Sequence, residues 1–220
     1  MDKRNPNTIS TDLKIIVVGN AGNGKTSFVN RWTKNTFSDS YKATIVSEFA
    51  YKIYDDGKGK FYRIKLWDLA GQDKSINITK IFCRDAHGIV ILSDVTNNTS
   101  LNETIKWKNT ISENSKFMDG SEIPVILVEN KIDLLNEEEI KDDKSSIDFA
   151  MKNSYLRSFR VSAKSGINVN ESMDFLIKYI ITKLSLLNPK IEDKRNKNNN
   201  IKLNNNNNNN LDKKDKGSCC

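Results

Sequence analysis

The sequence predicts an α/β fold, a mostly parallel sheet with helices on both faces. Three observations predict it. Short apolar runs typical of buried strands alternate with longer amphipathic segments, a glycine-rich loop joins the first run to the first amphipathic segment, and two runs flank a tight turn. The expected buried strands are LKIIVV (13–18), GIVILSD (88–94) and PVILVEN (124–130), and the expected helices are residues 25–37, 101–117 and 168–187.

The turn sequence DDGKGK, at residues 55–60, lies between the extended runs TIVSEFAYKIY and FYRIKLWDL. A glycine-containing turn between such runs predicts a β-hairpin. One edge strand is therefore expected to be antiparallel to its neighbour, so that the sheet is mixed. The final helix starts beside Asn168, a residue type that caps helices, and repeats apolar residues at helical spacing.

The chain is long enough for one well-buried domain, which we place at residues 11–187. Residues 1–10 are expected to form a flexible N-terminus. Residues 188–220 are rich in Asn and Lys and contain almost nothing to bury, so they are expected to form a disordered tail.

Composition limits the classes of protein to consider. Three cysteines, two of them adjacent, cannot form the disulfide framework of a small secreted protein, so a reducing intracellular compartment is expected. The N-terminus lacks the apolar core of a signal peptide, and the apolar runs are too short to cross a membrane. The net charge of +7 comes with interleaved acids and no nucleic-acid-binding motif, so no nucleic-acid partner is expected.

The glycine-rich loop GNAGNGKTS follows the first strand and opens the first helix, which is the context of a phosphate-binding loop. Glycines let backbone N–H groups surround a polyphosphate, Lys25 reaches its outer oxygens, and the Thr26 hydroxyl suits a Mg²⁺ ion that bridges them. The alternative is a glycine turn that binds nothing. We predict a nucleotide site made by Gly19, Asn20, Ala21, Gly22, Asn23, Gly24, Lys25, Thr26 and Ser27.

The segment VENKIDL, at the end of a buried strand, predicts the base. Asn130, Lys131 and Asp133 stand in it, and a carboxylate at the last position accepts both the N1 and the N2 hydrogens of guanine. Adenine lacks that pair of donors and would leave the carboxylate unpaired. The pocket is completed after the next strand, in VSAKSG, by Ser162, Ala163 and Lys164.

Two segments between these motifs are expected to contact the terminal phosphate. In LWDLAGQD, Asp68 suits the water-mediated side of a Mg²⁺ site, the Gly71 N–H can approach the γ-phosphate, and Gln72 can orient an attacking water. In the earlier segment FSDSYKATIVSEF, Thr44 reaches Mg²⁺ and the γ-phosphate only while that phosphate is present. Two loops that hold one phosphate form a switch.

The order of these motifs resembles the Ras superfamily of small GTPases, and TIVSEF, WDLAGQD and CRDAHG are most similar to the Rab family. The segments ATIVSEFA, IKWKN and NVNESMDFLIKYI are most similar to the Rab subgroup of lysosome-related organelles. The resemblance implies the P-loop small-GTPase fold, with a six-stranded, mostly parallel sheet, one antiparallel edge strand and five flanking helices. It also implies slow hydrolysis of GTP to GDP and recruitment of effectors in the GTP state.

The resemblance assigns further roles. Gln72 and Lys25 would be the catalytic residues, and the Mg²⁺ ligands would be Thr26, Thr44 and Asp68. Phe37 matches the aromatic residue that packs against the guanine edge, and Tyr41 matches the one near the phosphates. The effector interface would comprise Ile45, Phe49, Trp67 and Phe82, with core packing as the alternative role for these aromatic rings.

The sequence departs from the Rab pattern in the switch segments. Val46 replaces a glycine, which stiffens the first switch segment, and Ser75 stands where a large aromatic residue is usual. Ala21 stands where the smallest residue favours hydrolysis. These departures leave open a nucleotide-locked scaffold that binds effectors constitutively. An ATP-using P-loop enzyme is a second alternative, disfavoured by the base motif.

The chain ends in GSCC, with Cys219 and Cys220 adjacent. Rab proteins commonly carry a geranylgeranyl group on each of two such cysteines, and two chains suffice for stable anchoring. The resemblance therefore implies a lipid anchor on the cytoplasmic face of an endomembrane, with cycling through the cytosol. The implied partners are effectors, an exchange factor, a GTPase-activating protein, a Rab escort protein and a GDP-dissociation inhibitor, all serving vesicle-mediated transport.

Overall fold

The computed structural model of the chain describes residues 9–40, 44, 47–71, 81–141 and 144–187. Several predicted residues lie outside these ranges: Tyr41, Ile45, Val46, Gln72, Ser75, Cys219 and Cys220. So do most of the predicted N-terminal segment and the whole predicted tail. The chain divides into two compact units, residues 1–180 and 181–220.

A six-stranded mixed sheet forms the centre of the first unit, in the order β2-β3-β1-β4-β5-β6. The strands are β1 (Ile9–Val18), β2 (Ser47–Asp55), β3 (Phe61–Leu69), β4 (Gly88–Asp94), β5 (Val125–Asn130) and β6 (Arg157–Arg160). The edge strand β2 runs antiparallel to β3, and the other neighbours are parallel. The predicted fold class is confirmed, including the hairpin and its antiparallel edge strand.

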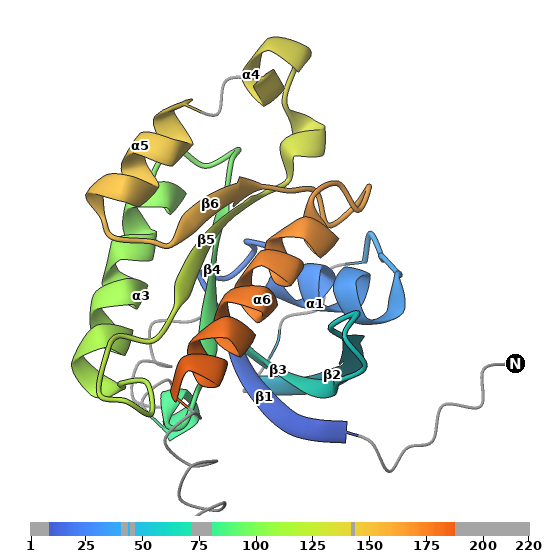
Figure 1. Cartoon of the computed structure of the whole chain (residues 1–220). Helices are drawn as coiled ribbons and strands as arrows, with labels where there is room; N and C mark the ends of the chain where they lie inside the picture. Colours follow the sequence, from blue (N-terminus) through green and yellow to red (C-terminus); the bar gives the residue numbers. More distant parts are fainter. Residues whose placement is uncertain (1–8, 41–43, 45–46, 72–80, 142–143, 188–220) are drawn as a thin grey trace, which may run out of the picture. The chain divides into compact units, whose positions relative to one another are not determined.

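Helices cover both faces of the sheet (Figure 1). They are α1 (Lys25–Lys34), α3 (Ser100–Asn114), α4 (Glu137–Lys141), α5 (Lys144–Lys152) and α6 (Val169–Leu187), with a short 3-10 helix at Ile132–Leu134. Helices α3 and α5 lie on one face, and α1 and the part of α6 within the first unit lie on the other (Figure 1). Helix α6 packs closely against β4 at Gly88, because a Cβ at that position would lie 2.7 Å from Ile180 Cδ1.

Several element boundaries differ from the prediction: α3, for example, ends at Asn114, three residues before the predicted end at residue 117. Two other differences have a clear physical reason. Strand β1 begins at Ile9, inside the segment predicted to be flexible, and its exposed end is held by Asp12, which forms an ion pair with Lys65 at 2.6 Å. Helix α1 ends at Lys34, three residues before the predicted end, because Asn35 adopts a left-handed conformation with φ 54° and its N–H bonds to the Arg31 carbonyl. The residues after Asn35 are thereby free to line the site.

The core is formed by the central strands, and every residue of β4 is buried. Because five strands are parallel, their carboxyl ends meet at one edge, and the predicted motifs follow directly after them. His87 lies away from that edge, where its Nδ1 accepts a hydrogen bond from the Lys14 N–H at 3.1 Å. Within the described ranges, no helix is both long and apolar enough to span a membrane.

Candidate functional site

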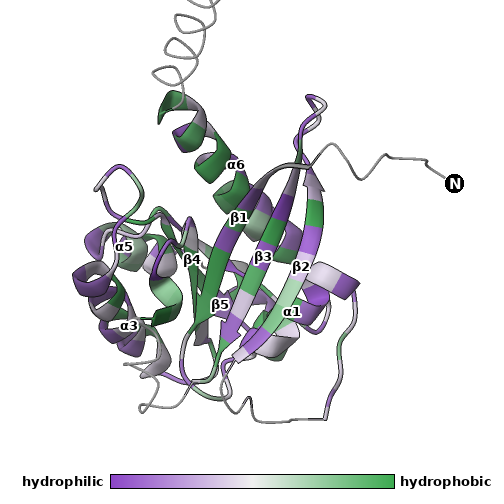
Figure 2. Ribbon diagram, turned by 90° about the horizontal axis from the view of Figure 1, so that it is seen from below, coloured by the Kyte–Doolittle hydropathy of each residue, from purple (hydrophilic) through white to green (hydrophobic). Residues whose placement is uncertain are grey.

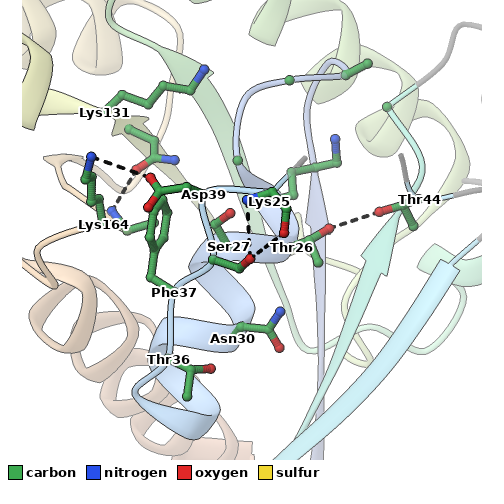
Figure 3. Close-up of a pocket in the computed structure, with 18 of the residues that line it drawn as sticks. Lys25, Thr26, Ser27, Asn30, Thr36, Phe37, Asp39, Thr44, Lys131 and Lys164 are labelled. Carbon is green, nitrogen blue, oxygen red and sulfur yellow. Dashed lines mark hydrogen bonds and ion pairs between the residues drawn. The ribbon is translucent and has the colours of Figure 1, made fainter. Parts of the chain in front are cut away.

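A cavity of about 760 Å³ opens at the carboxyl edge of the sheet. It is lined by most of the residues that the sequence singles out: Ala21, Gly22, Gly24, Lys25, Thr26, Ser27, Phe37, Thr44, Gly71, Asn130, Lys131, Asp133, Ala163 and Lys164. Figure 3 shows Thr26 and Thr44 on one side of the cavity and Phe37, Lys131 and Lys164 on the other. Segments more than 100 residues apart in the sequence therefore meet around one space.

The loop before α1 has the backbone shape of a phosphate loop. Gly24 has φ 84°, a left-handed conformation that glycine adopts at little cost, and a Cβ there would lie 2.3 Å from Asn130 Nδ2. Gly71 approaches the same loop, since its carbonyl accepts a hydrogen bond from the Ala21 N–H at 2.9 Å. The loop precedes the N-terminus of α1, where unpaired N–H groups and the helix dipole favour an anion.

Two buried ionisable side chains stand at one end of the site, Lys25 in the cavity lining and Asp68 behind it. Lys25 is 6% exposed, its Nζ donates to the Asn20 carbonyl at 2.9 Å, and burial lowers its pKa to about 8. Burial raises the pKa of Asp68 to about 6, although the hydrogen bond from Thr26 and the charge of Lys25 act the other way. Each charge is costly in the protein alone, so phosphates beside Lys25 and a cation beside Asp68 would stabilise both.

Oxygen atoms gather beside Asp68 in a manner that suits a hard cation. Thr26 Oγ1 donates to Asp68 Oδ2 and lies 2.9 Å from Thr44 Oγ1, the contact drawn in Figure 3. Asp68 Oδ1 is buried and has no hydrogen-bond partner within the described ranges. Hydroxyl and carboxylate oxygens are the ligands that Mg²⁺ prefers, so these residues fit the predicted metal.

The loops that follow β5 and β6 are linked into one wall of the cavity, here called the base-side wall because the sequence predicts that the base binds there. Asn130 Oδ1 accepts from the Ala163 N–H at 3.0 Å, and Asn130 Nδ2 donates to the Asn23 carbonyl at 2.9 Å. Asp133 Oδ1 accepts from Ser162 Oγ at 2.5 Å. Asp133 is therefore held at the cavity wall. Among the described residues no donor bonds to its second carboxylate oxygen, which can accept a ligand donor.

Several predicted site residues have side chains that lie behind the cavity: Asn20, Asn23, Asp68 and Ser162. Asn23 Nδ2 donates to the Leu92 carbonyl at 2.7 Å, and the Asn20 side chain is bonded to α3. Gly19 likewise does not line the cavity, because a Cβ there would lie 2.3 Å from the Leu92 carbonyl oxygen. These residues support the loops, and any ligand contact they make is through the backbone or a bridging atom.

Two supporting residues were missed by sequence reasoning. Asp94, at the end of β4, forms an ion pair with Lys131 at 2.5 Å. Burial acts to raise the pKa of Asp94, but hydrogen bonds from Lys131 and Thr96 outweigh it and hold the pKa below its usual range. Arg31 of α1 donates from Nε to the Ala163 carbonyl at 2.9 Å and from Nη2 to the Lys164 carbonyl at 2.5 Å. An acid at a strand end was a usable signal for Asp94, whereas nothing local marks Arg31.

The segment after α1 adds lining residues that the sequence did not single out: Thr36, Ser38, Asp39 and Ser40. Asp39 lies 3.6 Å from Lys164 Nζ, an exposed ion pair across the mouth of the cavity (Figure 3). Asn30, Glu48 and Leu134 complete the lining.

The three aromatic residues predicted at the effector interface form a continuous row. The ring of Trp67 lies 5.1 Å from that of Phe49 and 5.2 Å from that of Phe82. Phe49 is 50% exposed, and Trp67 is half-buried. Figure 2 shows strands β1, β3 and β2 side by side with α1 behind them, so the outward side chains of β2 and β3 share one face of the sheet.

A phosphate loop at a strand–helix junction, a base-side wall with a fixed carboxylate and a mixed six-stranded sheet together define a P-loop small GTPase. The sequence profile of the Ras family matches residues 14–182, and the chain belongs to that family.

Curated relatives place it more finely. Rab-32 of Sus scrofa is 32% identical over 177 residues, which cover 80% of this chain and 77% of the relative. Rab-7L1 of Homo sapiens is 36% identical over 165 residues, 75% of this chain and 80% of the relative, and Rab-32A of Dictyostelium discoideum is 35% identical over 169 residues, 76% and 77%. The chain is thus a Rab-family small GTPase that hydrolyses GTP to GDP, as the sequence predicted, in the subgroup of these relatives.

Proposed function

We propose that this chain is a GTP-dependent molecular switch of vesicle-mediated transport, in which the cavity described above holds the nucleotide. The observation that carries the proposal is the presence of two buried ionisable groups at one end of the cavity, Lys25 in its lining and Asp68 behind it. Burial lowers the pKa of Lys25 to about 8 and raises that of Asp68 to about 6. A triphosphate beside Lys25 and a divalent cation beside Asp68 would stabilise the charged form of each group. The opposite wall, with the carboxylate of Asp133, offers the acceptor that the two guanine donors require.

Each residue then has a role that follows from its position. The loop amides and Lys25 bind the phosphates, and Asp133 binds the N1 and N2 hydrogens of guanine. Phe37 covers the base edge. Thr26, Thr44 and Asp68 would hold Mg²⁺, which neutralises charge on the phosphates when it is bound. Gln72, outside the described residues, orients the attacking water.

The switch arises because the segment that contains Thr44 is held when a γ-phosphate is present and released when it is absent. In the structure its hydroxyl contacts Thr26, a residue of the phosphate site, and Thr44 belongs to the segment between α1 and β2. A γ-phosphate holds this segment, and hydrolysis releases it. In the row formed by Phe49, Trp67 and Phe82, the first two residues lie on β2 and β3, the strands that flank the two switch segments, and Phe82 lies in a helical turn before β4. We assign this row, with Ile45, to effector binding.

The remaining parts of the proposal concern regulation and location. Slow intrinsic hydrolysis calls for a GTPase-activating protein that supplies an arginine, and a buried nucleotide calls for an exchange factor. Geranylgeranyl groups on Cys219 and Cys220 would anchor the chain, through the tail at 188–220, to the cytoplasmic face of an endomembrane. A Rab escort protein would deliver it, and a GDP-dissociation inhibitor would return it to the cytosol.

Single-turnover hydrolysis tests the catalytic proposal. We expect GTP-loaded protein with Mg²⁺ to release phosphate slowly, and an activating cell extract to accelerate release. Gln72→Leu should bind GTP as the unmodified protein does but release phosphate about 100-fold more slowly, the low end of what a positioned catalytic group contributes. If no phosphate is released even with extracts, the chain is the nucleotide-locked scaffold instead.

A second prediction concerns Arg31, which fixes the base-side wall from α1. Arg31→Gln removes the donors to the Ala163 and Lys164 carbonyls, so fluorescent GDP should dissociate about three- to tenfold faster, as expected for the loss of partly exposed charged hydrogen bonds. Lys34→Gln, which removes an exposed cation from the same helix end, serves as the matched control. An Arg31→Gln rate equal to that of the control would show that the loop is held without Arg31.

A further inference from the structure

The side chain of Asn20 forms a bridge from the phosphate loop to α3. Trp107 Nε1 donates to Asn20 Oδ1 at 2.7 Å, and Asn20 Nδ2 donates to Glu103 Oε2 at 2.5 Å. Glu103 and Trp107 are four residues apart, so they share one face of the helix. Trp107 is 7% exposed, and Asn20 and Glu103 are half-buried.

The polarity of the two α3 residues requires an amide between them. The indole of Trp107 can only donate a hydrogen bond, and the ionised carboxylate of Glu103 can only accept one. A linking side chain must accept at one end and donate at the other, which an Asn amide does. An aspartate of the same shape would satisfy Trp107 but place its carboxylate against that of Glu103.

The bridge holds the part of the loop on which Lys25 depends. The backbone carbonyl of Asn20 accepts the hydrogen bond from Lys25 Nζ at 2.9 Å. The next residue, Ala21, donates its N–H to the Gly71 carbonyl at 2.9 Å. The same helix contacts the loop again through Ser100, whose Oγ donates to Asn23 Oδ1 at 3.4 Å, a longer bond than those of Asn20. Asn20 therefore makes the shorter of the hydrogen bonds that connect α3 to the loop.

We propose that Asn20 is a positioning residue, which fixes the phosphate loop and Lys25 against α3 through its polarity-matched hydrogen bonds to Glu103 and Trp107. The role is indirect, because the Asn20 side chain faces α3 and does not line the cavity. The inference rests on the proposed nucleotide site.

An exchange of polarity between positions 20 and 103 tests the proposal. Asn20→Asp keeps the shape but sets two carboxylates at hydrogen-bond distance, so GDP should dissociate about tenfold faster, the factor expected when a part-buried hydrogen bond is replaced by a repulsive contact. Adding Glu103→Gln supplies an amide donor to the new aspartate, and the double variant should return to within about threefold of the unmodified rate. Glu113→Gln, on an exposed position of the same helix, should not rescue Asn20→Asp.

The measurement is release of fluorescent GDP from each Mg²⁺-loaded protein, with thermal unfolding recorded in parallel. Trp107→Phe, which removes the indole donor, should also accelerate release, and Glu103→Gln should not restore it. The proposal is overturned if Asn20→Asp releases GDP at the unmodified rate, or if Glu103→Gln and Glu113→Gln rescue it equally. If the unmodified protein binds no guanine nucleotide, the proposed function fails first, and the two failures are thereby distinguished.

Discussion

Asp133→Asn should abolish most of the affinity for GDP and GTP and transfer it to xanthine nucleotides. Guanine presents two adjacent donors, and a carboxylate accepts both, whereas an asparagine offers one acceptor and one donor. One guanine hydrogen would then face an N–H group. Xanthine carries a carbonyl in place of the guanine amino group, so the asparagine pairs with it. We expect guanine nucleotide affinity to fall at least about 100-fold, as when buried donors lose their acceptor.

The structure indicates that this variant will fold. The Ser162 hydroxyl that donates to Asp133 Oδ1 at 2.5 Å can bond equally to an amide oxygen. Competition of unlabelled nucleotides against fluorescent GDP and fluorescent XDP measures the change. Asp148→Asn, which removes an exposed acid on α5, is the control. An Asp133→Asn variant with unchanged nucleotide preference would mean that Asp133 does not read the base, and would revive the ATP-using alternative.

Replacing both terminal cysteines should release the protein from membranes without affecting the nucleotide site. A single lipid chain gives only marginal membrane binding, whereas two give stable anchoring. Cys219→Ser with Cys220→Ser should therefore be almost entirely cytosolic, and either single variant should divide between membrane and cytosol. The net positive tail would add a weaker attraction to anionic lipids that cannot hold the protein alone.

Fractionation of cells that express each variant measures this effect, with GDP binding of the purified proteins as the check on folding. Ser218→Ala, which changes the neighbouring residue and leaves both thiols, should remain on membranes. A double cysteine variant that stays membrane-bound would show that another part of the chain or a partner provides the attachment.

Local patterns predicted the fold because each buried element of this protein carries its own signal. Every residue of β4 is buried, so the apolar run in the sequence predicts both ends of the strand, Gly88 and Asp94, correctly. The glycines of the phosphate loop predict its left-handed backbone conformations, and the DDGKGK turn predicts the hairpin. These features depend only on residues that are close in the sequence, so one sequence is enough to predict them.

Features that depend on tertiary partners were not predictable in the same way. The start of β1 is held by ion pairs from Asp12 to β3, and polar residues there do not look like a buried strand. Arg31 acts on a loop 132 residues away through backbone carbonyls, which carry no sequence signal. Asn20 was predicted to touch the nucleotide because of its place in the loop, but its side chain faces α3, since Glu103 and Trp107 offer it both of its hydrogen bonds.

The nucleotide content of the purified protein tests the central claim most directly. Protein prepared throughout in Mg²⁺ is denatured with acid, and the released nucleotides are separated and quantified. The proposed site predicts a stoichiometric amount of guanine nucleotide, mainly GDP, which is lost after treatment with a chelator because the divalent cation helps to hold the phosphates. Adenine nucleotide in its place, or no nucleotide at all in Mg²⁺, would contradict the account.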